Sequence, residues 1–144
     1  MYPFDLIFLT LNVLVLPFWG LLLFAPRWKW TQILSGLIAP LILSVIFIVF
    51  FVIEFPSSGG KFGSITDLKI PLTSPFVLLA MWTHYLAFDL FIGAWEVRDS
   101  QRLGIPFIKV FPHVLLTMLL GPFGFIGYLF TRFPVSRTLD SDAS

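Results

Sequence analysis

Cysteine is absent from this 144-residue chain, and charged residues make up only 12% of it. Without cysteine, the chain forms neither a disulfide-stapled secreted module nor a thiolate-ligated iron–sulfur centre. Soluble domains carry about twice this share of charged residues. The 9 basic and 8 acidic side chains leave a net charge of +1, which gives no electrostatic basis for a nucleic-acid partner.

The chain is instead rich in apolar residues, which form 58% of the sequence. A soluble domain of this size buries only about two-thirds of its unfolded surface, so much of this apolar material would remain exposed to water. A helix needs about 20 apolar residues to cross a hydrocarbon core about 30 Å thick. Four stretches meet that length and predict an all-α integral membrane protein, a four-helix bundle with helices at about 6–25, 33–53, 75–95 and 107–130.

We expect one transmembrane domain over residues 1–134, followed by a disordered polar tail over 135–144. The first span is preceded by an acidic segment containing Asp5 and is followed by no small-residue cleavage site. We therefore expect a retained helix rather than a signal peptide.

Basic residues in short loops orient a membrane protein, with the richer side facing the cytoplasm or its equivalent. If each of the four helices crosses the membrane once, the two sides of the membrane carry similar numbers of basic residues. The first and third connections would hold Arg27, Lys29, Arg98, Arg102 and Lys109, and the opposite side Lys61, Lys69, Arg132 and Arg137. The first connection carries more basic residues than the N-terminal segment does, which favours both termini lying away from the cytoplasm.

Proline lies inside three of the four spans, at Pro17, Pro40 and Pro122. Each removes a backbone hydrogen bond and tends to kink its helix. The segment Gly121–Gly124, which reads Gly-Pro-Phe-Gly, is expected to break the fourth helix. Its freed carbonyl groups need a neighbour or a polar cavity, unless the glycines serve only close helix packing.

The third span carries His84 and Asp89 near its middle. An ionisable residue at this depth is by default a candidate functional group. The two side chains lie about 140° apart around a helix, so each needs a partner from elsewhere. Asp89 is either a site residue or a structural lock bonded to Asn12 or Thr117, and His84 is either a packing or a ligand-facing group.

Residues 96–102 carry both charge signs, which is typical of a solvated turn but would also suit the mouth of a cavity. Other site classes lack their residues. No lysine lies at mid-membrane for a retinal Schiff base, no Glu-x-x-His cluster suits a di-iron site, and His84 and His113 lie at different depths. We predict neither a metal nor a cofactor, although one histidine could ligate a chlorophyll or a haem.

About a third of the chain carries a denser pattern, from Trp82 to Tyr128. It includes Trp82, His84, Phe88-Asp89-Leu90-Phe91, Trp95, Arg98-Asp99, Gly104-Ile105-Pro106, Gly121-Pro122-x-Gly124 and Tyr128. This block resembles the abscisic-acid-deficient-4-like family of small four-helix membrane proteins. Members often have histidine after Gly-Ile-Pro, where this chain has Phe107.

The resemblance implies a role in carotenoid metabolism, because plant members act in the conversion of the epoxide violaxanthin to the allene neoxanthin. This isomerisation needs an acid for the epoxide oxygen and a base for a vinylic proton. The implied catalytic pair is Asp89, in its neutral form, as the acid and His84 as the base. The implied substrate-binding residues are Trp82, Tyr85, Phe88, Trp95, Glu96, Arg98 and Asp99.

A non-catalytic alternative is a pigment-binding or assembly subunit of a photosynthetic membrane complex, holding a carotenoid or chlorophyll. The 18 Phe, 5 Trp and 3 Tyr residues suit either function. The expected partners are a carotenoid or other hydrophobic pigment and the lipid bilayer, with a second copy of the chain or a membrane complex left open. The expected location is a chloroplast, thylakoid or bacterial inner membrane.

Overall fold

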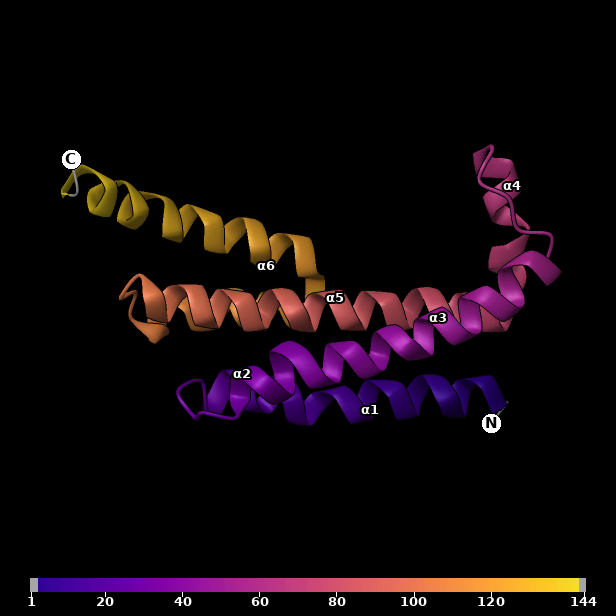
Figure 1. The fold of residues 1–144 in the computed structure, drawn as a ribbon, viewed down its shortest axis with the longest axis horizontal. Helices are drawn as coiled ribbons and strands as arrows, with labels where there is room; N and C mark the ends of the chain where they lie inside the picture. Colours follow the sequence, from indigo (N-terminus) through magenta and orange to yellow (C-terminus); the bar gives the residue numbers. More distant parts are fainter. Residues whose placement is uncertain (1–2, 143–144) are drawn as a thin grey trace. The chain divides into compact units, whose positions relative to one another are not determined.

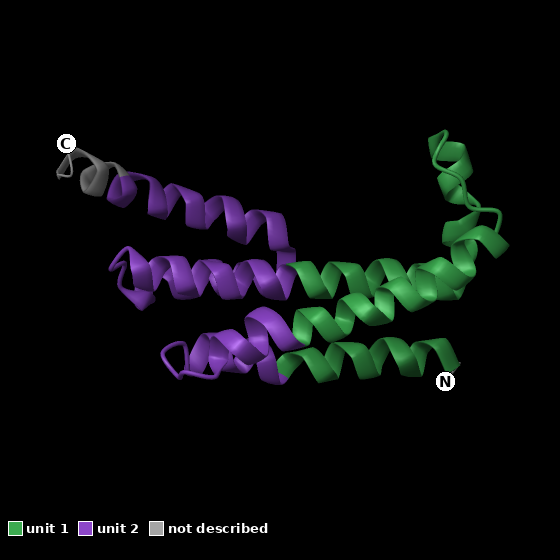
Figure 2. Cartoon of the chain, in the orientation of Figure 1, with its two compact units in different colours: residues 1–16, 39–88 green, residues 17–38, 89–144 purple. Residues whose placement is uncertain are grey.

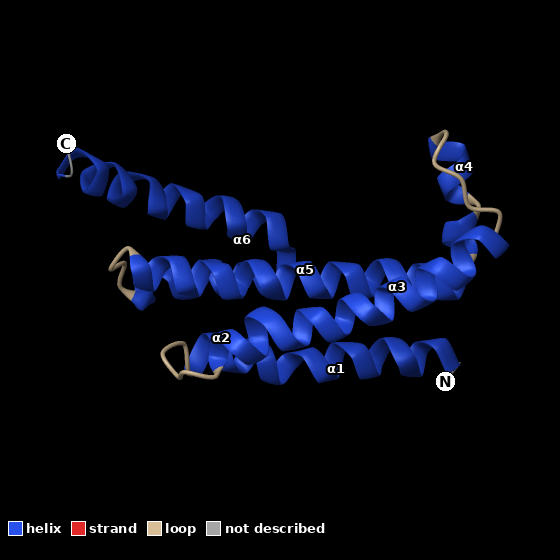
Figure 3. Cartoon of the chain, in the orientation of Figure 1, coloured by secondary structure: helices blue, strands red, loops and turns tan. Residues whose placement is uncertain are grey.

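The computed structural model describes residues 3–142, and side chains are described as far as Ser136. The described chain contains helices and loops but no strand (Figure 3), which confirms the all-α class. The elements are α1 (Pro3–Phe24), α2 (Thr31–Ile33), the π-helical turn η1 (Leu34–Ile38), α3 (Ala39–Ser57), α4 (Ile65–Lys69), the short 3-10 helix η2 (Pro71–Thr73), α5 (Pro75–Arg102) and α6 (Phe107–Asp142) (Figure 1).

Judged by length and composition alone, four helical segments are long and apolar enough to cross a membrane. They are Pro3–Phe24, Thr31–Ser57, Pro75–Arg102 and Phe107–Ser136. Each overlaps one of the four stretches predicted from hydropathy. The integral membrane class therefore follows from the length and composition of the helices.

The backbone divides into two compact units (Figure 2), and each is described by itself. Unit 1 comprises residues 1–16 and 39–88, and unit 2 comprises residues 17–38 and 89–144. A single domain over residues 1–134 stays a prediction.

Unit 1 packs the first part of α1, α3 and the first part of α5 largely through aromatic side chains. Phe4 contacts Phe76 with ring centroids 5.0 Å apart, and Phe8 lies 5.0 Å from Trp82. The side chains of Val77 and Ala80 on α5 are fully buried. These contacts fix the faces of α1 and α5 that meet in this unit.

Helix α5 ends at Arg102, about two turns beyond the predicted end of the third span. Residues 96–102 are therefore helical and do not form a solvated turn. The helix continues because Glu96 and Asp99 are buried against α6 rather than hydrated. Two residues past the end of the helix, Gly104 has a φ of +67°, which suits a residue without a Cβ, and Pro106 follows.

Helix α6 is not one straight rod but folds back on itself at Leu120, where φ is −148° and ψ is 70°. The imidazole of His113 lies 2.8 Å from the Thr131 hydroxyl, 18 residues further along. In a straight helix these residues would be about 27 Å apart. The element is therefore a helical hairpin with a first arm over 107–119 and a second arm over 121–142, which returns toward the end where α6 begins (Figure 1).

The predicted break at Gly121–Gly124 is thus present, and it reverses the chain rather than kinking a crossing helix. Pro122 has no N–H for a helical bond and disfavours helical geometry in the residue before it. Glycine then allows the two arms to touch, because a Cβ at Gly127 would lie 2.8 Å from the His113 ring. The first arm has 13 residues, about 20 Å, which is too short to cross a hydrocarbon core about 30 Å thick.

The backbone of the second arm is helical to Asp142. It therefore runs through most of the segment 135–144 for which the sequence predicts a disordered tail. Residues 143–144 lie outside the described residues.

Candidate functional site

The end of the hairpin opposite its tip is held to α5 by the carboxylate of Asp99. Tyr128 donates its hydroxyl hydrogen bond to this carboxylate at 2.7 Å, and the Arg132 guanidinium donates to the same oxygen at 2.7 Å. Arg102 binds the second oxygen at 2.9 Å. Asp99 is 5% exposed, so it joins α5 to the second arm within unit 2 rather than facing an open binding site.

Glu96 lies one turn before Asp99 and is fully buried. The Thr117 hydroxyl on the first arm donates a hydrogen bond to its Oε1 at 2.8 Å. Its Oε2 is also buried and has no hydrogen-bond partner among the described residues. Burying an unpaired charge is costly, so Oε2 is the atom of this carboxyl at which a proton or an external donor would be accommodated.

Asp89 lies against the tip of the hairpin. A Cβ added at Gly121 would fall 2.9 Å from Oδ2 of Asp89 and closer still to Oδ1. This carboxyl therefore reaches the start of the second arm, where helix N–H groups lack intrahelical partners and the helix dipole favours a negative group. Of the partners predicted for a lock, Thr117 instead binds Glu96, and Asn12 accepts a hydrogen bond from Trp82 at 3.3 Å.

Asp89 and Glu96 are seven residues apart on α5, which places them on nearly the same face of the helix. Trp95 lies beside this face, with its ring 5.4 Å from that of Tyr128. Around the hairpin, α5 therefore presents the acidic side chains of Asp89, Glu96 and Asp99 together with the ring of Trp95, whereas Arg98 is exposed.

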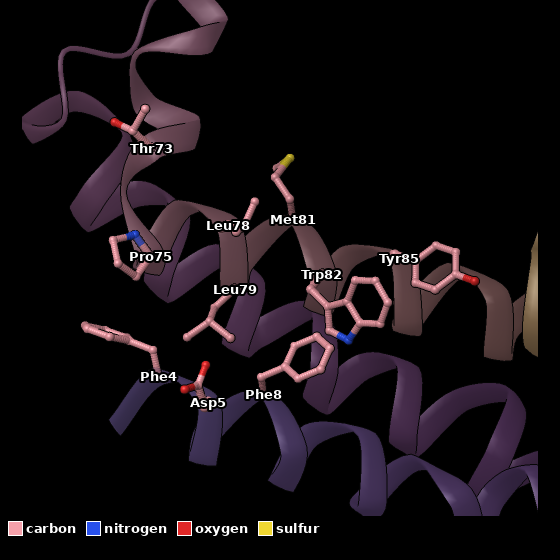
Figure 4. A pocket seen from close by; sticks show the side chains of 10 residues that line it. All are labelled: Phe4, Asp5, Phe8, Thr73, Pro75, Leu78, Leu79, Met81, Trp82 and Tyr85. Carbon is pink, nitrogen blue, oxygen red and sulfur yellow. The ribbon is translucent and has the colours of Figure 1, made fainter. Parts of the chain in front are cut away.

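A separate apolar cavity lies within unit 1. Its volume is about 750 Å³, within the range of about 300–1,000 Å³ typical of small-molecule sites. Two of the predicted substrate-binding residues, Trp82 and Tyr85, line it from α5. The complete lining, drawn in Figure 4, is Phe4, Asp5, Phe8, Thr73, Pro75, Leu78, Leu79, Met81, Trp82 and Tyr85.

Asp5 supplies the carboxyl group of this cavity (Figure 4). The sequence gives little indication of that role, because Asp5 stands near the N-terminus and is naturally interpreted as a flank of the first span. The signal available was its spacing from Phe8, since residues three to four apart share a helix face.

His84 does not line the cavity. Its ring stacks on Phe47 with centroids 5.2 Å apart, and the ring of Phe88 meets it edge-on at 4.7 Å. Both His84 and Phe88 are exposed in the described chain. Eight of the nine predicted site residues therefore fall into three groups, and the ninth, Arg98, is exposed on its own. The groups are Trp82 and Tyr85 at the cavity, His84 and Phe88 on an exposed face, and Asp89, Trp95, Glu96 and Asp99 around the hairpin.

These features define a helical membrane protein with apolar spans, a helical hairpin and a small-molecule-sized apolar cavity. Its described residues contain no group of three or more His, Cys, Asp or Glu able to hold a metal ion.

The chain belongs to the ABA DEFICIENT 4-like family, whose model matches residues 6–128. This match confirms the resemblance drawn from the block between Trp82 and Tyr128 and extends it over the first two helices. No curated protein and no solved structure matches the chain.

Proposed function

We propose that this protein binds a xanthophyll in the membrane and isomerises its epoxide end to an allenic alcohol, as the family resemblance implies. The observation that carries the proposal is the aromatic cavity of unit 1, in which apolar walls are joined by the polar residues Asp5, Tyr85 and Trp82. A rigid, apolar ring with one oxygen function matches such a lining, since apolar contact supplies affinity and a few polar groups fix orientation.

The reaction moves protons and no net electrons. An acid donates a proton to the epoxide oxygen as the carbon–oxygen bond breaks, and a base removes a vinylic proton as the allene forms. The acid and base predicted from the sequence are Asp89 and His84. The cavity adds Asp5 as a third candidate, because it is the carboxyl that lines the space proposed for the substrate.

The experiment is to express the full chain in a bacterium engineered to make violaxanthin and to separate the extracted pigments by chromatography. We expect a new allenic product, which falls at least about 100-fold when a required proton-transfer group is removed. Asp89→Asn, His84→Gln and Asp5→Asn test the three candidates separately, and Asp67→Asn, in the exposed helix α4, is the matched control. Intact violaxanthin with the wild-type protein present in the membrane overturns the proposal.

A second candidate function is non-catalytic pigment binding, which one observation favours. His84 and Asp89 lie on different faces of α5 by helical periodicity, and neither lines the cavity. Under this alternative the protein purified in mild detergent carries a bound pigment visible in its absorption spectrum. The Trp82→Ala variant then loses that pigment, while no product forms with any variant.

A further inference from the structure

The basic residues of unit 2 gather at one end. This basic end consists of the connection 25–30, the last turn of α5, the first turn of α6 and the neighbouring part of the second arm. Gln101 donates a hydrogen bond to the carbonyl of Pro26 at 2.8 Å, which joins the connection to α5. Asp99 binds Arg132 and so joins α5 to the second arm.

The hairpin is what assembles this end. A straight fourth helix would carry Arg132 to the opposite side of the membrane, whereas the hairpin returns it to Asp99. Of the eight basic residues whose side chains are described, six belong to the basic end, and only Lys61 and Lys69 belong to unit 1. The six are Arg27, Lys29, Arg98, Arg102, Lys109 and Arg132.

Most of this positive charge is not neutralised within the described chain. The carboxylate of Asp99 is buried and already shared between Arg102 and Arg132. Among the described residues, no carboxylate lies within ion-pair distance of the other four basic side chains, all of which are exposed. These four are Arg27, Lys29, Arg98 and Lys109.

Two exposed indole rings mark the depth of this surface. Trp28 and Trp30 are 48% and 44% exposed, and tryptophan is enriched at the level of the lipid head groups. The Lys29 ammonium lies 5.6 Å from the centre of the Trp30 ring. Two exposed indoles flanking Lys29 are typical of a segment at the boundary between hydrocarbon and water, the depth at which lipid phosphates lie.

We propose that the basic end of unit 2 is a docking surface for anionic lipid head groups, and that it lies in the cytoplasmic or equivalent leaflet. The six-to-two distribution of described basic residues sets that orientation by the positive-inside rule. Clusters of four or more lysine and arginine residues next to a membrane span attract anionic lipid. The proposal is independent of any pigment chemistry.

The test measures lipid selectivity of the full chain reconstituted in mixed phosphatidylcholine and phosphatidylglycerol vesicles. Spin-labelled lipids report the relative association of each head group with the protein. We expect phosphatidylglycerol to associate several-fold more strongly than phosphatidylcholine, and this preference to vanish in about 1 M NaCl, where the Debye length is about 3 Å.

The variant R27Q/K29Q/R98Q/K109Q removes the four unpaired charges, and K61Q/K69Q is the matched control in unit 1. We expect the first to lose most of this several-fold selectivity, so that phosphatidylglycerol and phosphatidylcholine associate about equally, and the control to keep it. All six substituted side chains are exposed, so the far-UV circular dichroism of both variants should match that of the wild type. The salt titration of the wild-type chain tests the same proposal without any substitution. Equal selectivity in wild type and the fourfold variant, or equal loss in the control, overturns the proposal.

A parallel measurement with millimolar inorganic phosphate distinguishes a lipid head group from free phosphate as the bound anion. Unchanged lipid selectivity in its presence supports a surface for head groups held in the bilayer. Full competition by free phosphate identifies a soluble-anion site and overturns the lipid proposal.

Discussion

The helical hairpin of α6 can be tested with the substitution Gly124→Ala, which adds a Cβ atom between the two arms. A Cβ at Gly124 would lie 2.5 Å from the carbonyl oxygen of His113 and closer still to the amide nitrogen of Thr117. These are backbone atoms of the first arm, so no side-chain rotation relieves the clash. The arms must separate by more than 0.9 Å to restore the 3.4 Å of an ordinary contact, because the Thr117 nitrogen lies closer than the His113 oxygen.

Overpacking of this kind costs about 1–3 kcal/mol, and the backbone clash places Gly124→Ala near the upper end of that range. Gly20→Ala is the matched control, because no atom lies within 4 Å of its added Cβ. It should stabilise the chain by about 0.5–1 kcal/mol, since alanine is the better helix former.

The assay is thermal unfolding in mild detergent, followed by far-UV circular dichroism. We expect the midpoint of Gly124→Ala to fall by about 5 °C or more, and that of Gly20→Ala to stay level or rise. A straight α6 would give both substitutions the same favourable sign. If Gly124→Ala is as stable as Gly20→Ala, the hairpin is refuted.

Three further outcomes follow from the same contacts. Because the chain has no cysteine, single-cysteine variants report on which side of the membrane a residue lies. A membrane-impermeant maleimide should label Ser136→Cys and Ser58→Cys from opposite sides of the membrane. Labelling of both variants from the same side contradicts the hairpin. Asp99→Asn should destabilise the chain by about 3 kcal/mol, because it breaks a buried ion pair. Arg102→Gln should cost less than about 1 kcal/mol, because the Arg102 side chain is 69% exposed. Equal losses of unfolding free energy for the two variants in chemical denaturation would contradict this prediction. Thr117→Val should lower the free energy of unfolding by about 1–3 kcal/mol, because it removes the hydrogen-bond donor to a buried carboxyl. Thr117→Ser keeps the hydroxyl and should restore that stability. If serine does not restore it, the loss comes from packing.

Hydropathy predicts the helices well because burial in lipid is a property of whole segments. The start of the third helix at Pro75 was predictable from Ser74 and Pro75, which are typical of a helix N-terminus. Its end was not, because the polarity of residues 96–102 is compensated by partners on α6 that are far away in sequence.

The hairpin shows the limit of this reasoning most clearly. An average over residues 107–130 is equally apolar whether the chain crosses the membrane or turns back at its middle. The proline at 122 indicates a break but not an angle. The available signal was the spacing of Gly121, Gly124 and Gly127, which puts small residues on one side of the second arm.

The candidate site was predictable in residue type more than in grouping. Trp82 and Tyr85 do line one cavity, and Asp89 and Glu96 do share one side of α5. Helical periodicity supplies these relations within an element. It supplies no partner across elements, so neither Asp5 as the cavity carboxyl nor Thr117 as the donor to Glu96 could be predicted.

The hairpin also imposes an order on biogenesis. Helix α5 carries Asp89, Glu96 and Asp99, and apart from Arg102 beside Asp99 the partners that compensate them lie between residues 117 and 132. Acidic groups are costly in the hydrocarbon until they are compensated. During synthesis, α5 must therefore be retained at the insertion machinery, or remain close to water, until about thirty more residues have emerged and the hairpin closes on it.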